Sequence, residues 1–212
     1  MKSEPPFDFA LQPHQRRHDP QGYADYASYR EWLRDEFNYR CAYCLSRENW
    51  GPPIGSFHLD HMIAVVVDAS LRTEYRNLVY ACCTCNLAKG KRRLPDPTQV
   101  AIGTCLRVDA AGYIHAIDAN GDGQRLIDGL GLKRRKLREW RAKWLKKLRY
   151  YQKHADDPEC QELMIGDFGY PVSNLTNLAK LAPPGGNTQR RGICDSAYAL
   201  QKRGKHPRFI CS

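Results

Sequence analysis

Cys41-Ala-Tyr-Cys44 and Cys82-Cys-Thr-Cys85 are the two segments that decide the fold of this chain. In each segment the outer cysteines have the two-residue gap of a zinc knuckle, and four thiolates at this spacing can close a tetrahedral Zn²⁺ site. Cys83 is a spare thiol, because Cys82 keeps the two-residue gap to Cys85. The sequence therefore predicts one structural zinc bound by Cys41, Cys44, Cys82 and Cys85.

A second group of polar residues lies between the two cysteine pairs and directly after them. The segment His58-Leu-Asp60-His61 offers a carboxylate, which is a natural ligand of Mg²⁺ or Mn²⁺, and an imidazole that can take a proton from water near neutral pH. Asn86 follows the last zinc cysteine, so the zinc would fix its backbone, and its amide oxygen is a candidate second ligand. His58 would share a strand face with Asp60 and is a candidate third ligand. The alternative for His58 is an ordinary strand histidine bonded to the backbone or packed near zinc.

Composition and charge narrow the class of protein and of partner. The chain has 212 residues, nine cysteines and a formal net charge of +10, which favours nucleic acid as the partner. No segment approaches the roughly 20 apolar residues of a membrane span, and the start of the chain has no apolar core of signal-peptide length. We therefore expect a cytoplasmic protein without membrane contact, whose reduced cysteines bind metal.

The chain divides into four parts by composition and periodicity. Residues 1–22 lack periodicity and are expected to form a flexible arm. Residues 23–97 are expected to form the core: a helix over 23–40 with a capping box at Ser28 and Glu31, strands within 57–67 and 78–81, and a short helix over 85–91. Residues 98–165 are expected to hold a hairpin (106–118) and a long helix (133–154). Residues 166–212 are expected to be an irregular tail.

The long helix carries most of the positive charge. This segment contains eleven Lys and Arg residues and only one acidic residue, Glu139. Its apolar residues recur at helical spacing. The apolar stripe predicts a packing face, and the charge favours contact with a nucleic-acid backbone over an ordinary solvated face. The expected contacts, which include a second basic group after Asn86, are Lys89, Lys91, Arg92, Arg93, Arg134, Arg135, Arg138, Arg141 and Lys146.

Over about residues 28–94 the arrangement resembles the zinc-knuckle branch of the HNH endonuclease family, which has the ββα-metal fold. The resemblance implies that Asp60 and Asn86 bind the catalytic metal and that His61 is the general base. It also implies that Asn77 holds the loop between the two strands by hydrogen bonding, and Lys89 would contact phosphate. The sequence departs from the family at Ala64, where a proline is common, and in residues 68–76, so the shape of this loop is an open question.

We therefore expect an α+β fold: a small ββα-metal HNH core with a structural zinc bound by four cysteines, flanked by an N-terminal helix and by a C-terminal hairpin with a long basic helix. The expected function is hydrolysis of DNA phosphodiester bonds with Mg²⁺ or Mn²⁺, and RNA remains open as a substrate. Two alternatives stay open: a zinc-dependent nucleic-acid-binding module without catalysis, and a nuclease subunit that is silent until a partner protein assembles with it. The C-terminal segment resembles the tails of stand-alone bacterial HNH proteins and would wrap the nuclease core or dock a partner. The expected type is a bacterial stand-alone or defence-type HNH protein, and a protein partner from a defence complex is an open alternative. Strandedness, sequence preference and homo-oligomer formation stay open as well.

Overall fold

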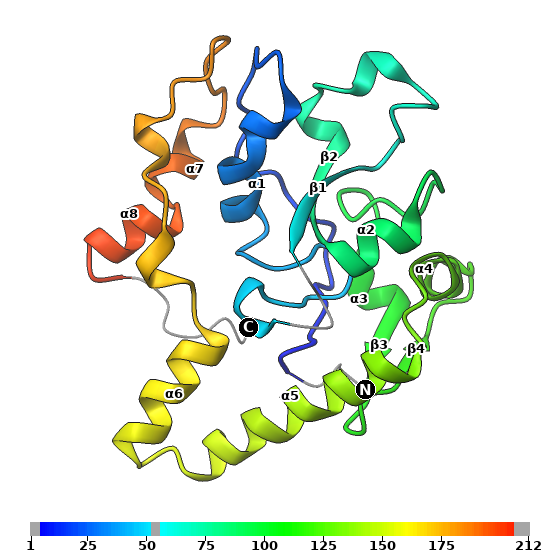
Figure 1. Cartoon of the computed structure of the whole chain (residues 1–212), viewed down its shortest axis with the longest axis vertical. Coiled ribbons are helices and arrows are strands. Elements are labelled where there is room, and N and C mark those ends of the chain that lie inside the picture. Colours follow the sequence, from blue (N-terminus) through cyan, green and yellow to red (C-terminus); the bar gives the residue numbers. More distant parts are fainter. Residues whose placement is uncertain (1–4, 52–55, 206–212) are drawn as a thin grey trace.

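The computed structural model describes residues 5–51 and 56–205, and it combines eight helices with two small sheets in this part of the chain (Figure 1). This mixture confirms the expected α+β class. The helices are α1 (Arg30–Glu36), α2 (Cys83–Lys89), α3 (Ile102–Cys105), α4 (Asp122–Leu130), α5 (Arg135–Lys153), α6 (Pro158–Phe168), α7 (Arg190–Cys194) and α8 (Ala197–Lys202). The strands are β1 (Phe57–His61), β2 (Leu78–Cys82), β3 (Leu106–Val108) and β4 (Ile114–Ala116).

A ββα unit forms the centre of the molecule. Strands β1 and β2 pair antiparallel, with Phe57 opposite Cys82 and His61 opposite Leu78, and α2 follows β2 without a loop and packs on both strands. The strand expected within 57–67 ends at His61. Residues 62–77 instead form a loop with two 3₁₀ turns, because the side chains of Asp68 and Glu74 accept hydrogen bonds from the backbone two residues on.

The N-terminal helix is shorter than expected and begins differently. A 3₁₀ turn (Tyr26–Tyr29) leads into α1, and the carboxylate of Asp25 caps that turn by accepting from the Ala27 N–H at 3.0 Å. The capping box predicted at Ser28 is therefore wrong, because the chain already turns three residues earlier. The predicted apolar face is confirmed, since Tyr29, Trp32, Leu33 and Phe37 are all buried.

Residues 5–22, which we expected to be flexible, lie against α1. His18 is fully buried; its backbone N–H donates to Glu36 at 2.9 Å and its Nε2 lies 2.8 Å from Asp35 Oδ2. His14 Nε2 lies 2.6 Å from the other oxygen of Glu36. Burial of two carboxylates on α1 requires such partners, and the arm supplies them. Residues 1–4 of the expected arm lie outside the described residues.

The tail expected to be irregular is partly helical and returns to the same helix. Helices α7 and α8 lie within it, and the Ala197 N–H at the start of α8 donates to Asp35 Oδ1 at 2.7 Å. A β-bridge joins Pro20 to Asn187. Segments from the beginning and the end of the described chain thus both pack on α1 (Figure 1).

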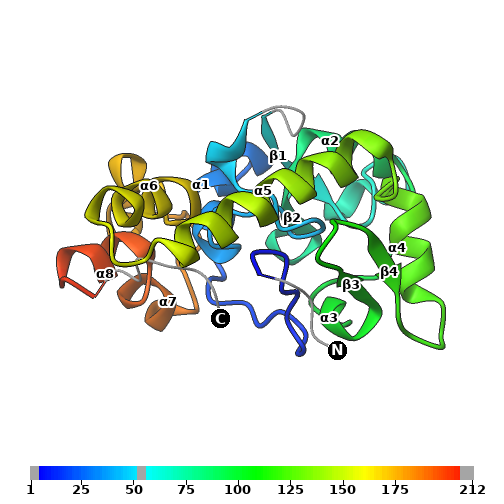
Figure 2. The same ribbon diagram turned by 90° about the horizontal axis from the view of Figure 1, so that it is seen from below.

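The long helix packs through the predicted stripe. Its five predicted packing residues, Leu137, Trp140, Trp144, Leu148 and Tyr151, are all buried. Trp144 stacks on Trp50, at the end of the first cysteine knuckle, with ring centroids 4.4 Å apart. Seen from below, α5 crosses the molecule, with the hairpin of β3 and β4 near its N-terminal end (Figure 2). The hairpin is confirmed, and α4 forms where we expected only a broken segment.

Candidate metal and catalytic site

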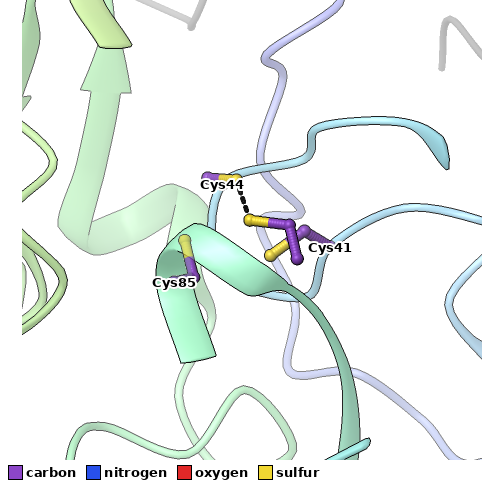
Figure 3. Close-up of side chains that lie close together, drawn as sticks. Cys41, Cys44 and Cys85 are labelled. Carbon is purple, nitrogen blue, oxygen red and sulfur yellow. Dashed lines mark hydrogen bonds between the residues drawn. The ribbon is translucent and has the colours of Figure 1, made fainter. Parts of the chain in front are cut away.

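Four buried cysteines converge where the first knuckle meets the β2–α2 junction. The Sγ atoms of Cys41, Cys44, Cys82 and Cys85 all lie within 4.8 Å of one another, and Figure 3 shows three of these side chains gathered from two segments of the chain. The pKa of the Cys44 thiol lies well below its usual value because its thiolate accepts hydrogen bonds from the other three cysteines. Four sulfur donors in one buried cluster fit a structural Zn²⁺ site, as the sequence predicted.

The carboxylate of Asp60 lies at the end of β1 and is held on both sides. Its Oδ2 accepts a hydrogen bond from the Tyr43 hydroxyl at 2.6 Å, and its Oδ1 lies 3.0 Å from the ammonium of Lys89. Burial raises the pKa of Asp60, and Lys89 and Tyr43 only partly offset that effect. Because Tyr43 lies between Cys41 and Cys44 and Lys89 lies on α2, the first cysteine knuckle and α2 together orient this carboxylate.

Lys89 is not available for the phosphate contact expected from the sequence. Its side chain is 1% exposed, and its ammonium also donates to the backbone carbonyl of His61 at 2.6 Å. The physical reason is the buried charge of Asp60, which needs a cationic partner. The sequence carried a signal for this burial: Lys89 follows the buried Cys85 by four residues and so shares its helical face.

His61 is half-buried at the last position of β1, and its two ring nitrogens differ. Its Nε2 lies 2.8 Å from the backbone oxygen of Arg72, and its ring meets Tyr26 edge-on at 4.9 Å between centroids. A carbonyl oxygen can only accept, so Nε2 carries a proton, and in the neutral form of the ring Nδ1 keeps the lone pair. The loop over β1 and β2 thus presets the tautomer in which Nδ1 can act as a base.

Asn77 closes that loop with its side chain. Its Oδ1 accepts from the Ile63 N–H at 2.9 Å, and its Nδ2 donates to the carbonyls of Ile63 and Leu71 at 3.0 and 3.2 Å. These bonds correspond to the loop-holding role that the resemblance implied. They also explain how a loop with Ala64 in place of proline keeps a defined shape.

The two remaining candidate ligands differ in their surroundings. Asn86 is half-buried on α2, directly after the buried Cys85. His58 is exposed, and its Nε2 lies 2.9 Å from Ser56 Oγ. Among the described residues, His58 does not form a group of three metal-ligating side chains with Asp60 and His61. The structure favours the alternative in which His58 is an ordinary strand histidine.

The basic residues fall into two separate surfaces. Lys91, Arg92 and Arg93 are exposed directly after α2, whereas Arg134, Arg135 and Lys146 are exposed along α5 and its start. Figure 1 draws α5 along the lower edge of the molecule and the β1–β2 loop at the upper right. The charge of α5 therefore lies away from the loop that positions His61.

Two residues of the long helix have structural partners that the sequence did not reveal. Arg141 is buried and donates to the carbonyls of Gly112 and Leu132 at 2.8 and 3.0 Å, and burial lowers its pKa to about 10. Arg138 is half-buried and lies over the ring of Tyr113. The structure does not support the contact with a nucleic-acid backbone that we expected for Arg141, because the guanidinium of Arg141 joins the hairpin to α5.

Comparison with known proteins agrees with the geometry of the core. Residues 41–92 match the family model described as HNH endonuclease, which confirms the resemblance from the first cysteine of the cluster to three residues beyond the end of α2. No curated protein matches the chain. Within the described residues, no helix is long and apolar enough to cross a membrane. The match implies an activity related to nucleic acid, and a nuclease is the usual member of that family.

Proposed function

We propose that this protein is a metal-dependent endonuclease that hydrolyses DNA phosphodiester bonds, with His61 as the general base. The observation that carries the proposal is the preset tautomer of His61, whose Nε2 is bonded to the Arg72 carbonyl and whose Nδ1 is left as an acceptor. The half-buried position of His61 at the end of β1, one residue after Asp60, is also consistent with this role. The family match over residues 41–92 supports the same conclusion.

The residue types of the two candidate ligands, Asp60 on β1 and Asn86 on α2, fit a hard divalent cation. Asp60 supplies a carboxylate and Asn86 an amide oxygen, which are ligand types that Mg²⁺ and Mn²⁺ prefer. Each oxygen of Asp60 already accepts one hydrogen bond, and a carboxylate has about four lone-pair sites, so acceptor capacity remains. A cation bound there would stabilise the charge that develops on the phosphate and on the leaving 3′ oxygen.

The protein's own residues would then perform three tasks. Nδ1 of His61 takes the proton from the attacking water, while the Arg72 carbonyl holds the ring in place and stabilises the imidazolium that forms. Asn77 keeps the loop that carries this carbonyl in position. Tyr43 and Lys89 hold the Asp60 carboxylate in one orientation. The family resemblance implies products with 5′-phosphate and 3′-hydroxyl ends.

One observation favours a second candidate function, a zinc-dependent nucleic-acid-binding module without catalysis. Both oxygens of Asp60 are engaged, and one of them pairs with the buried ammonium of Lys89. A carboxylate whose role is to neutralise this lysine would show the same geometry. The two functions differ in one property, which is the cleavage of nucleic acid in the presence of Mg²⁺ or Mn²⁺.

The test is incubation of the purified, zinc-loaded protein with supercoiled plasmid, single-stranded DNA and RNA. We expect nicked and then linear plasmid with Mg²⁺ or Mn²⁺, no product when both are omitted, and one zinc per chain by metal analysis. Co-expressed proteins that purify with the chain are tested in parallel for activation. Binding to nucleic acid without cleavage under all of these conditions would overturn the nuclease proposal in favour of the binding module.

A further inference from the structure

A groove lies beside the loop that carries the candidate catalytic residues. Three segments line it: the β1–β2 loop, the chain that follows α2, and the first turn of α4. Its volume is about 390 Å³, which is within the range of roughly 300–1,000 Å³ typical of small-ligand pockets. The groove is therefore large enough for a group of nucleotide size.

Three arginines and three carboxylates line the groove, and two of these arginines pair with a carboxylate: Arg76 with Asp19 at 3.2 Å and Arg125 with Asp122. Within the described residues, Arg93 makes no hydrogen bond or ion pair and is exposed. Arg125 is also exposed and pairs with Asp122 at 2.9 Å. Asp96 accepts from the backbone N–H and the hydroxyl of Thr98 at 2.7 and 2.8 Å. The rim therefore offers an anion the guanidinium of Arg93 and those N–H groups of Arg125 that Asp122 does not use.

The wall of the groove is apolar and half-buried. Met62 and Ile63 supply it from the β1–β2 loop, and Leu94 and Val100 supply it from the chain after α2. An apolar wall beside exposed guanidinium groups matches the two halves of a nucleotide, whose base is flat and weakly polar and whose phosphate is anionic. A simple anion such as inorganic phosphate would leave the apolar wall unused.

The position of the groove connects it to His61. Met62 is the next residue in the chain, and its N–H donates to the Asn77 carbonyl at 2.8 Å. Ile63 is held by the side chain of Asn77. The groove therefore begins one residue beyond His61, within reach of a nucleic-acid strand whose scissile phosphate lies there.

We propose that this groove binds the nucleotide next to the scissile phosphate, with a backbone phosphate on Arg93 and Arg125 and the base against the apolar wall. The inference rests on the proposed function and extends it. Residues 93–125 lie outside the segment that matches the HNH family, so this contact belongs to the chain's own extension. The groove is therefore where this protein would differ from other HNH proteins in its preference for flanking sequence.

The experiment uses the full-length, zinc-loaded protein with His61→Ala, which removes cleavage, and fluorescent DNA oligonucleotides at several salt concentrations. The added double variant Arg93→Ala/Arg125→Ala should weaken binding and reduce the salt slope by about 0.9, since the two arginines share one phosphate and each phosphate contact contributes about 0.9. Gln99→Trp, at an exposed groove position, should weaken binding by occupying the groove without changing the slope. The matched control is Lys180→Ala/Arg191→Ala, which removes two exposed charges outside the groove, one at the end of the 3₁₀ turn Leu178–Lys180 and one on α7, and should leave both quantities unchanged.

The outcomes separate the groove from the proposed function. Equal losses in the groove variant and the control, or no loss in the groove variant, would overturn the groove while leaving the nuclease intact. An unchanged affinity of the Gln99→Trp protein would overturn the nucleotide-binding wall. Failure of the His61→Ala protein to bind any nucleic acid would overturn the proposal that the groove binds a nucleotide. If the parent protein also cleaves no nucleic acid, the proposed nuclease function is overturned as well.

Discussion

Replacement of Tyr43 by phenylalanine should destabilise the protein through Asp60. The substitution keeps the buried ring and removes only the hydroxyl, which donates to Asp60 Oδ2 at 2.6 Å. A hydrogen bond to a charged group contributes about 1.5–3 kcal/mol, and its loss leaves a buried carboxylate oxygen without that partner. We therefore expect the free energy of unfolding to fall by about 1.5–3 kcal/mol. Cleavage should also fall, because the orientation of Asp60 is then set by Lys89 alone.

The assay is urea unfolding of the zinc-loaded protein, followed by tryptophan fluorescence, with zinc content measured for each variant. Tyr150→Phe is the matched control: Tyr150 is 55% exposed, and its loss of a hydroxyl should change stability by no more than about 0.5 kcal/mol. If Tyr43→Phe keeps its zinc and is as stable as the parent, the zinc knuckle does not hold Asp60 through this hydroxyl. A loss of zinc in Tyr43→Phe would likewise contradict an effect confined to Asp60.

Three further substitutions test other parts of the site and fold. Asn77→Ala removes three hydrogen bonds of the β1–β2 loop, so we expect plasmid cleavage to be lost and the unfolding free energy to fall by about 2–3 kcal/mol while zinc content stays unchanged. Arg141→Met leaves two buried carbonyls unpaired, so urea unfolding should show a loss of about 1–3 kcal/mol, whereas Lys146→Ala should change stability by less than about 0.5 kcal/mol. Burial alone would raise the pKa of Glu36, but hydrogen bonds from His14 and the Arg17 N–H outweigh it and lower that pKa. Its contribution to stability is therefore present above the unfolded pKa of about 4.3 and is lost as pH falls through the lower folded pKa, so Glu36→Gln should flatten the acid limb of the melting temperature against pH.

The parts of the fold that follow from local sequence pattern were predictable. The two-residue gaps of the cysteine pairs led to the four-sulfur cluster, and the spacing from Leu137 to Tyr151 led to the buried face of α5. Both patterns report a geometric requirement that the sequence itself carries: a tetrahedral ligand set in one case and a helical period in the other. The positions of these residues needed no knowledge of distant contacts.

The contacts of the charged residues were not predictable in the same way. Lys89 and Arg141 read as surface charges, yet the structure buries both because each satisfies a buried acceptor from another part of the chain. The same holds for His18, whose partner on α1 is 17 residues away. Such pairings depend on tertiary packing, which local periodicity does not report. Tyr43 offered a signal in hindsight, since a side chain between two zinc ligands has a fixed direction.

The same limit applies to the length of the first strand. Residues 62–67 are apolar and β-branched in part, so pattern alone extended the strand past His61. The loop forms there because Asn77 offers the backbone of Ile63 and Leu71 other partners than a sheet. Together with the turns capped by Asp68 and Glu74, these bonds end β1 at His61.

The most direct test of the proposed mechanism is the cleavage of supercoiled plasmid by the His61→Ala protein compared with the parent, at equal zinc content and with Mg²⁺ or Mn²⁺. Loss of a general base removes about 10²–10⁴-fold in rate, so nicking should fall by at least about a hundredfold while DNA binding and the melting temperature stay close to those of the parent. Cleavage by His61→Ala at a rate near that of the parent, with zinc retained, would contradict the assignment of His61 as the base.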